Sequence, residues 1–184
     1  MTGYVVAGVV LFALVVVAAV YNRLVARRNK ARQAWSGIDV QLTRRADLVP
    51  RLVETVKGYQ VHERQLLSAV TAARARIIAA GGPRESGEAD DALEGALQRL
   101  FAVAEAYPDL KASDNFLALQ TELSDLEEDI SFARRYYNAV TEDYNTTVQS
   151  FPVLLLAGPL GFAPREFFKA DAASREAPVA EFDR

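Results

Sequence analysis

Apolar side chains follow a helical period over two long stretches of the chain. Within each stretch they recur at alternating steps of three and four residues, as along the buried seam of a packed helix. A strand would need a period of two, which would place charged side chains on both of its faces. The first seam consists of Trp35, Ile38, Leu42, Arg45, Val49, Leu52, Val56 and Tyr59. The second consists of Phe116, Leu119, Leu123, Leu126, Ile130, Ala133, Tyr137, Val140, Tyr144, Thr147 and Phe151.

Two shorter amphipathic segments lie between these seams, and turn residues separate all four. Gly58, Gly81-Gly82-Pro83 and Pro108 interrupt the pattern, and Pro152 ends it. The predicted helices cover residues 22–57, 62–80, 90–107 and 114–150, with a polar linker from Gly81 to about Asp90. We therefore predict an all-α fold over residues 22–150: a long up-down-up-down four-helix bundle, in effect an antiparallel coiled coil.

The N-terminal end of the chain is apolar throughout. Its first 22 residues contain no charged side chain, and residues 4–21 are almost continuously apolar. At about 1.5 Å per residue, such a run crosses most of a bilayer core about 30 Å thick. A cleavable signal peptide would need basic residues before the run, and a lipoprotein anchor would need a cysteine, which the chain lacks. We predict a transmembrane helix over residues 1–21, with Tyr4 and Tyr21 as interfacial anchors.

A basic cluster follows this run directly and predicts the orientation of the chain. It consists of Arg23, Arg27, Arg28, Lys30 and Arg32, with no acid among them. Basic residues beside a span stay on the cytoplasmic side, so the N-terminus is expected outside and the helical domain in the cytoplasm. A specific site for anionic lipid is the alternative interpretation of the cluster.

A second charge-free apolar segment runs from Phe151 to Pro164, and Pro and Gly break it. The first and last long helices are about equal in length, so the chain should return at Phe151 to the membrane face from which it left. Residues 151–168 are therefore expected to lie against the membrane interface, to contact a neighbouring subunit or to cap their own bundle. The candidate contact residues are Phe151, Leu154, Leu155, Leu156 and Phe162. The tail at 169–184 is predicted to be disordered.

The two short helices can cover only half the length of the long pair. Tyr136, Tyr137, Val140 and Tyr144 are then expected to be partly uncovered in a monomer, which predicts a homo-oligomer. Trp35 is a further candidate for contacts between helices or subunits. Arg45 is expected to be partly buried and paired, with Glu122 or Glu127 as candidate partners; a ligand site that uses Arg45 is the alternative.

Motifs and composition give no support for catalysis. With no cysteine and one histidine, His62, the chain lacks thiolate ligands and an HExxH zinc motif. His62 is expected at the surface near the first turn between helices. Gly81-Gly82-Pro83 is followed by no Walker lysine, and the net charge of −3 gives no general attraction for nucleic acid. We predict no catalytic residue, no metal, no cofactor, no nucleic-acid partner and no small-molecule substrate.

Several segments in order resemble the LemA family. They are YNRLVARRN at 21–29, AWSGIDVQLTRRADLVPRLVETVKGY at 34–59, AYPDLKASDNFLALQTEL at 106–123 and RRYYNAVTEDYN at 134–145, with His62-Glu63 between. The resemblance extends to about Phe168. It implies a membrane-anchored helical bundle with its N-terminus outside, and it implies no reaction.

The expected function is therefore recognition: a single-pass membrane scaffold or adaptor of bacterial type that self-assembles and contacts lipid and other membrane proteins. The alternative is a membrane-shaping or membrane-sensing protein that acts through oligomerisation and residues 151–164.

Overall fold

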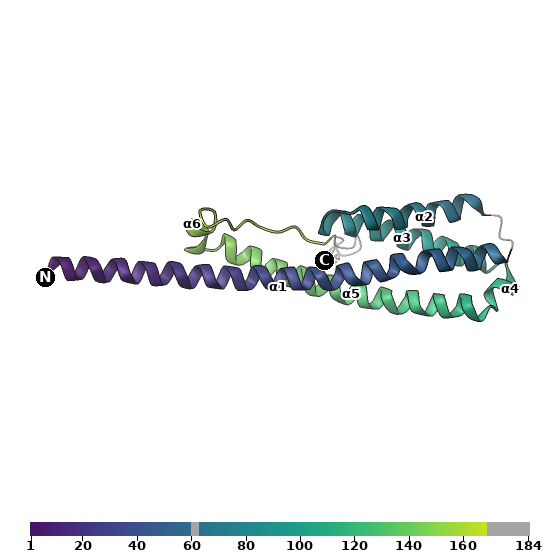
Figure 1. Cartoon of the computed structure of the whole chain (residues 1–184), viewed down its shortest axis with the longest axis horizontal. Helices are drawn as coiled ribbons and strands as arrows, with labels where there is room; N and C mark the ends of the chain where they lie inside the picture. Colours follow the sequence, from purple (N-terminus) through teal and green to yellow (C-terminus); the bar gives the residue numbers. More distant parts are fainter. Residues whose placement is uncertain (60–62, 169–184) are drawn as a thin grey trace, which may run out of the picture. The chain divides into compact units, whose positions relative to one another are not determined.

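The computed structural model describes residues 1–59 and 63–168, and its regular elements there are all helices. The predicted all-α class is thereby confirmed. Figure 1 shows the helices α1 (Thr2–Gly58), α2 (Arg64–Ala79), α3 (Pro83–Ala104), α4 (Pro108–Lys111), α5 (Asp114–Gln149) and α6 (Val153–Ala157). The predictions for His62 and for the tail at 169–184 lie outside the described residues.

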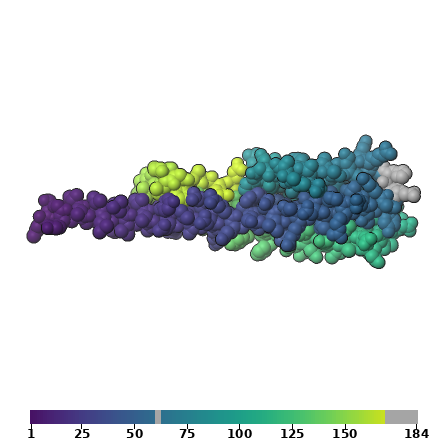
Figure 2. Space-filling view, viewed as in Figure 1, coloured from purple at the N-terminus to yellow at the C-terminus, as the bar shows by residue number. Residues whose placement is uncertain are grey.

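The first helix confirms the predicted apolar N-terminal element. α1 contains a window of 18 residues that is long and apolar enough to cross a membrane, and 0% of that window is buried by the rest of the protein. In Figure 2 the purple N-terminal stretch accordingly stands free of other side chains. The helix continues without a break from this segment through the basic cluster and Pro50 to Gly58, so the predicted boundary at residues 21–22 lies inside one helix.

The chain divides into two compact units, which we describe separately. The first unit comprises residues 1–41 of α1 together with residues 126–166, which include the second part of α5 and all of α6. The second unit comprises residues 42–125 and, among the described C-terminal residues, Phe167 and Phe168. α1 and α5 each contribute to both units.

In the second unit, buried aliphatic residues from α1, α2, α3, α4 and α5 form the core. The α2 seam of Leu67, Val70, Ala73 and Ile77 is buried along its whole length. Two polar interactions anchor α1 to its neighbours: Arg74 Nε on α2 donates to the Ala46 carbonyl at 2.9 Å, and Arg45 on α1 pairs with Asp90 on α3. The rings of Phe101 on α3 and Phe116 on α5 meet edge to face, with 5.9 Å between their centroids, inside the range of about 4.5 to 7 Å that such pairs prefer.

The third helix begins earlier than the sequence pattern predicts. α3 starts at Pro83, so most of the segment predicted as a linker from Gly81 to Asp90 is helical. Proline suits the first helical position because its fixed φ is already helical and its missing N–H is not needed there. Glu85 in the same turn accepts a 2.8 Å hydrogen bond from the Gly81 amide. The predicted end at Tyr107 is also displaced: α3 ends at Ala104, and Pro108 opens the short α4.

Candidate functional site

The first unit carries a C-terminal segment that packs back on α1 and α5. After α6 a turn over residues 158–161 leads into a strap without regular secondary structure, residues 162–166, which runs beside these two helices in Figure 1. Ala157 and Phe162 join Leu24, Tyr144 and Val148 in one buried cluster. Val20, Val25, Val153 and Leu160 pack around it. Because the segment has the same apolar character as the core it joins, its burial follows from the hydrophobic effect.

Side chains of α5 hold the strap through its backbone. The Tyr137 hydroxyl donates to the Glu166 carbonyl at 2.7 Å, and the Tyr144 hydroxyl donates to the Ala163 carbonyl at 3.0 Å. Asn145 makes a reciprocal pair with Arg165: its Nδ2 donates to the Arg165 carbonyl at 2.9 Å, and the Arg165 amide donates to its Oδ1 at 2.8 Å. Backbone carbonyl and amide groups of the strap thus have hydrogen-bond partners without a neighbouring strand.

These contacts correct the expectation that the second seam is uncovered. Tyr137, Val140 and Tyr144 are buried, whereas Tyr136 stays exposed. The Tyr137 ring also packs against half-buried Trp35, with 5.7 Å between ring centroids. Of the places considered for residues 151–168, the structure shows contact with their own helices, as in the alternative that they cap their own bundle. Sequence reasoning did not connect that alternative with the seam expected to be uncovered.

Burial and nearby positive charge shift the pKa of Tyr144 in opposite directions. Burial raises the pKa of the Tyr144 hydroxyl above its ordinary value of 10.0, and the guanidinium groups of Arg28, Arg165 and Arg32 partly offset this increase. A tyrosine hydroxyl is already protonated at neutral pH at its ordinary pKa, and the upward shift extends the protonated range to higher pH. The hydroxyl therefore remains a hydrogen-bond donor to the strap.

Replacing Asn145 with Ala should release the strap. The change removes two hydrogen bonds and leaves the Arg165 amide without its acceptor, a loss of about 2 kcal/mol. We expect faster hydrogen exchange at the Arg165 amide and a lower free energy of unfolding in detergent. Asn29→Ala is the matched control because Asn29 is exposed on α1 of the same unit. Equal effects of the two changes would contradict the assigned role.

The predicted basic cluster lies around the same segment. The Arg28 guanidinium lies over the Phe162 ring, 4.7 Å from the ring centroid. The Tyr21 and Phe162 rings meet edge to face, with 5.7 Å between their centroids. Arg27 pairs with Asp143 on α5. Arg23, Lys30 and Arg32 are exposed, as is Tyr4. Phe162 is therefore held between an aromatic and a cationic residue of α1.

The second unit contains a buried ion pair between α1 and α3. Arg45 Nη1 lies 2.8 Å from Asp90 Oδ1, and each side chain is only 4% exposed. Asp90 was missed because the sequence pattern placed it at the end of a linker. Extending the α3 seam backwards from Leu93 by three and seven residues reaches Asp90 and Ser86, both buried. Of the two predicted partners, Glu122 is exposed beside a hollow that Arg51 also lines, and Glu127 in the first unit is half-buried.

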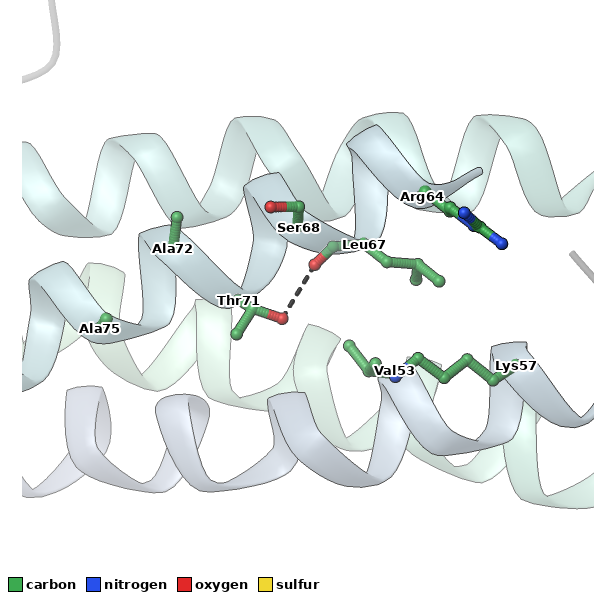
Figure 3. Close-up of a pocket in the computed structure, with 8 residues that line it drawn as sticks. All are labelled: Val53, Lys57, Arg64, Leu67, Ser68, Thr71, Ala72 and Ala75. Carbon is green, nitrogen blue, oxygen red and sulfur yellow. Dashed lines mark hydrogen bonds between the residues drawn. The ribbon is translucent and has the colours of Figure 1, made fainter. Parts of the chain in front are cut away.

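A groove of about 630 Å³ lies between α1 and α2 in the second unit (Figure 3). Lys57 and Arg64 stand at one end of it, and among the described residues that line it there is no carboxylate or imidazole. The Thr71 hydroxyl donates to the Leu67 carbonyl of its own helix at 2.9 Å. Among the residues that the structure describes, no group of three or more His, Asp or Glu is placed to hold a metal ion.

Comparison with known proteins finds matches over most of the chain. Residues 34–182 match the model of the LemA family. The chain is 29% identical over 158 residues to protein LemA of Metamycoplasma hominis, covering 84% of this chain and 71% of that protein. It is 29% identical over 174 residues to magnetosome protein MamQ of Magnetospirillum gryphiswaldense, covering 80% and 64%. It is 28% identical over 179 residues to magnetosome protein MamQ 2 of Paramagnetospirillum magneticum, covering 83% and 66%. The matches thus span less than two thirds of the two MamQ proteins.

Proposed function

The chain belongs to the LemA family, and from this membership and the character of α1 we propose that it is a single-pass, membrane-anchored scaffold or adaptor that self-assembles and catalyses no reaction. The observation that carries the proposal is that one continuous helix begins as an unburied apolar segment and ends inside a packed helical unit. Such a helix fixes a folded domain to a membrane. Neither the family's description nor the names of the relatives denote an enzyme.

The proposed orientation places the N-terminus outside, and the part of the chain that follows the apolar segment of α1 in the cytoplasm. It rests on the basic side chains that follow the apolar segment, since positively charged flanks stay on the cytoplasmic side. The proposed arrangement of the second unit is an antiparallel four-helix bundle. Its support is that the contacts of Arg45, Arg74 and Phe101 tie α1, α2, α3 and α5 to one another.

The proposed self-assembly surface is a face of α5 in the first unit. Phe132 and Tyr136 lie one helical turn apart there, and both are exposed. Around Phe132 the face carries the carboxylates of Glu128 and Asp129 together with the guanidinium of Arg135. A face with an aromatic centre and both signs of charge is complementary to a second copy of itself. Anchors in one bilayer would hold two copies with these faces at the same height.

The mass of the full-length protein in detergent tests this proposal. Light scattering should give a protein mass of two or more chains of 20.2 kDa each. The double change Phe132→Ser and Tyr136→Ser should reduce it to one chain, because it removes the apolar centre of the interface. Leu117→Ser, at an exposed leucine of α5 in the second unit, is the control and should leave the mass unchanged. A wild-type protein that is monomeric at every concentration would refute self-assembly.

A second candidate function is membrane shaping or sensing. One observation favours it: large apolar side chains at the start of the 151–164 segment stay exposed, although Ala157 and Phe162 of the same segment are buried. Oligomers that pressed such side chains into one leaflet would bend it. Vesicles that keep their shape when the full-length protein is reconstituted at high density would exclude this function.

A further inference from the structure

The segment around α6 has two faces of different character. Its inner face, with Val153, Ala157 and Phe162, packs on α1 and α5. Its outer face presents Phe151 at 81%, Leu154 at 55% and Leu155 at 65% exposure. We call these three residues the outer face of α6. The stretch from Phe151 to Pro164 contains no charged residue that would explain the exposure as a solvated surface.

The inner contacts of this segment fix its height along α1. Its cluster includes Leu24 of α1, and Val20 and Val25 pack against that cluster. Tyr21 meets Phe162 edge to face. The charge-free part of α1 ends at Asn22, so these contacts lie within about one helical turn, roughly 5 Å, of its end. All of these residues belong to the first unit, so the outer face of α6 and the end of the apolar segment are parts of one compact body.

The side chains next to this face match the boundary of a bilayer. Tyr21 is an aromatic residue at the end of an apolar helix, the place where such rings sit at headgroup level. Arg28 lies over Phe162, and Arg165 follows directly after the charge-free stretch. Guanidinium groups beside an exposed apolar face favour anionic phospholipid, because apolar insertion and charge attraction then act together.

We propose that the outer face of α6 sits in the boundary between headgroups and acyl chains of the bilayer that α1 crosses, giving each chain a second, interfacial membrane contact. The proposal rests on the proposed function in one respect, which is that α1 spans the membrane. The occupant is lipid because the face continues the apolar surface of the span at the same height. The strap contacts from Tyr137, Tyr144 and Asn145 hold the face there.

Site-specific fluorescence on the full-length protein tests the proposal, since the chain has no cysteine and each variant carries one label. Leu154→Cys carries the label on the outer face of α6. Val10→Cys places it in the apolar segment of α1. Val40→Cys places it at an exposed apolar position of α1 in the same unit, about 30 Å further along the helix than Val20. Each labelled protein is reconstituted into vesicles of equal parts phosphatidylcholine and phosphatidylglycerol, with and without acyl chains that carry a quencher.

The labels at positions 10 and 154 should both lose several-fold more fluorescence to the lipid quencher than the label at position 40. Equal, weak quenching at 154 and 40 with strong quenching at 10 would overturn the inference and leave the anchor intact. A blue-shifted but unquenched label at 154 would show that a second copy covers this face, which also overturns it. Weak quenching at position 10 would overturn the anchor itself.

Discussion

Replacing Asp90 with Asn is expected to lower the free energy of unfolding by about 3 kcal/mol, the low end of the cost of breaking a buried ion pair. Arg45 and Asp90 are 2.8 Å apart, and both side chains are 4% exposed. Neutralising the carboxylate leaves a buried guanidinium without the charge of this partner. The guanidinium keeps its charge in a protein, so it does not escape this by losing its proton. Denaturant unfolding of the full-length protein in detergent measures the change.

An exposed ion pair on the same helix provides the control. Glu88 pairs with Arg84 at 3.4 Å, but the two side chains are 46% and 71% exposed. Glu88→Gln makes the same chemical change two residues from Asp90, and it should cost less than about 0.5 kcal/mol because solvent screens the pair. The double change Arg45→Met and Asp90→Leu should recover much of the stability, since an apolar pair needs no compensating charge. Similar losses for Asp90→Asn and Glu88→Gln would contradict the role given to burial.

The Arg45–Asp90 pair shows which features of a buried contact a helical sequence pattern can predict. Arg45 occupies a seam position between Leu42 and Val49, and that spacing alone predicts its burial and its need for a carboxylate. The identity of the partner depends on where α3 begins. Ser86, Gly87 and Asp90 are weak helix formers, so local propensity favours a linker at this point. Packing decides otherwise, because these small and polar residues lie on the buried side of α3.

The strap was less predictable for a different reason. The stretch from Phe151 to Pro164 has no period of two or 3.6, since proline and glycine interrupt it, so no pattern indicates which of its residues face inwards. The strap is held by side chains of α5 that bind its carbonyl groups, and backbone acceptors are the same for every amino acid. Tyr137 and Tyr144 were predicted as seam residues from their spacing. Their hydroxyl partners depend on a chain reversal that spacing does not encode.

Phe162→Ala should destabilise the first unit by about 3 to 4 kcal/mol, as truncation of a buried aromatic side chain usually does. The Phe162 ring is 4% exposed, and its partners are Tyr21 at 5.7 Å and Arg28 at 4.7 Å. Its removal leaves a cavity and takes away both an edge-to-face and a cation–π contact. The Phe162 amide, which donates to the Ala157 carbonyl at 2.9 Å, should then exchange its hydrogen faster.

Phe151→Ala is the matched control, because it removes the same side chain from the same segment at a position that is 81% exposed. In detergent it should change the free energy of unfolding by less than about 0.5 kcal/mol. In vesicles, contact with lipid should depend on Phe151, although stability in detergent does not. Phe151→Ala should weaken the lipid quenching of a label at position 154 by removing an inserted ring, whereas stability stays unchanged. A fall in stability for Phe151→Ala equal to that for Phe162→Ala would mean that the ring of Phe151 belongs to the protein core and that the segment has no outer face for lipid.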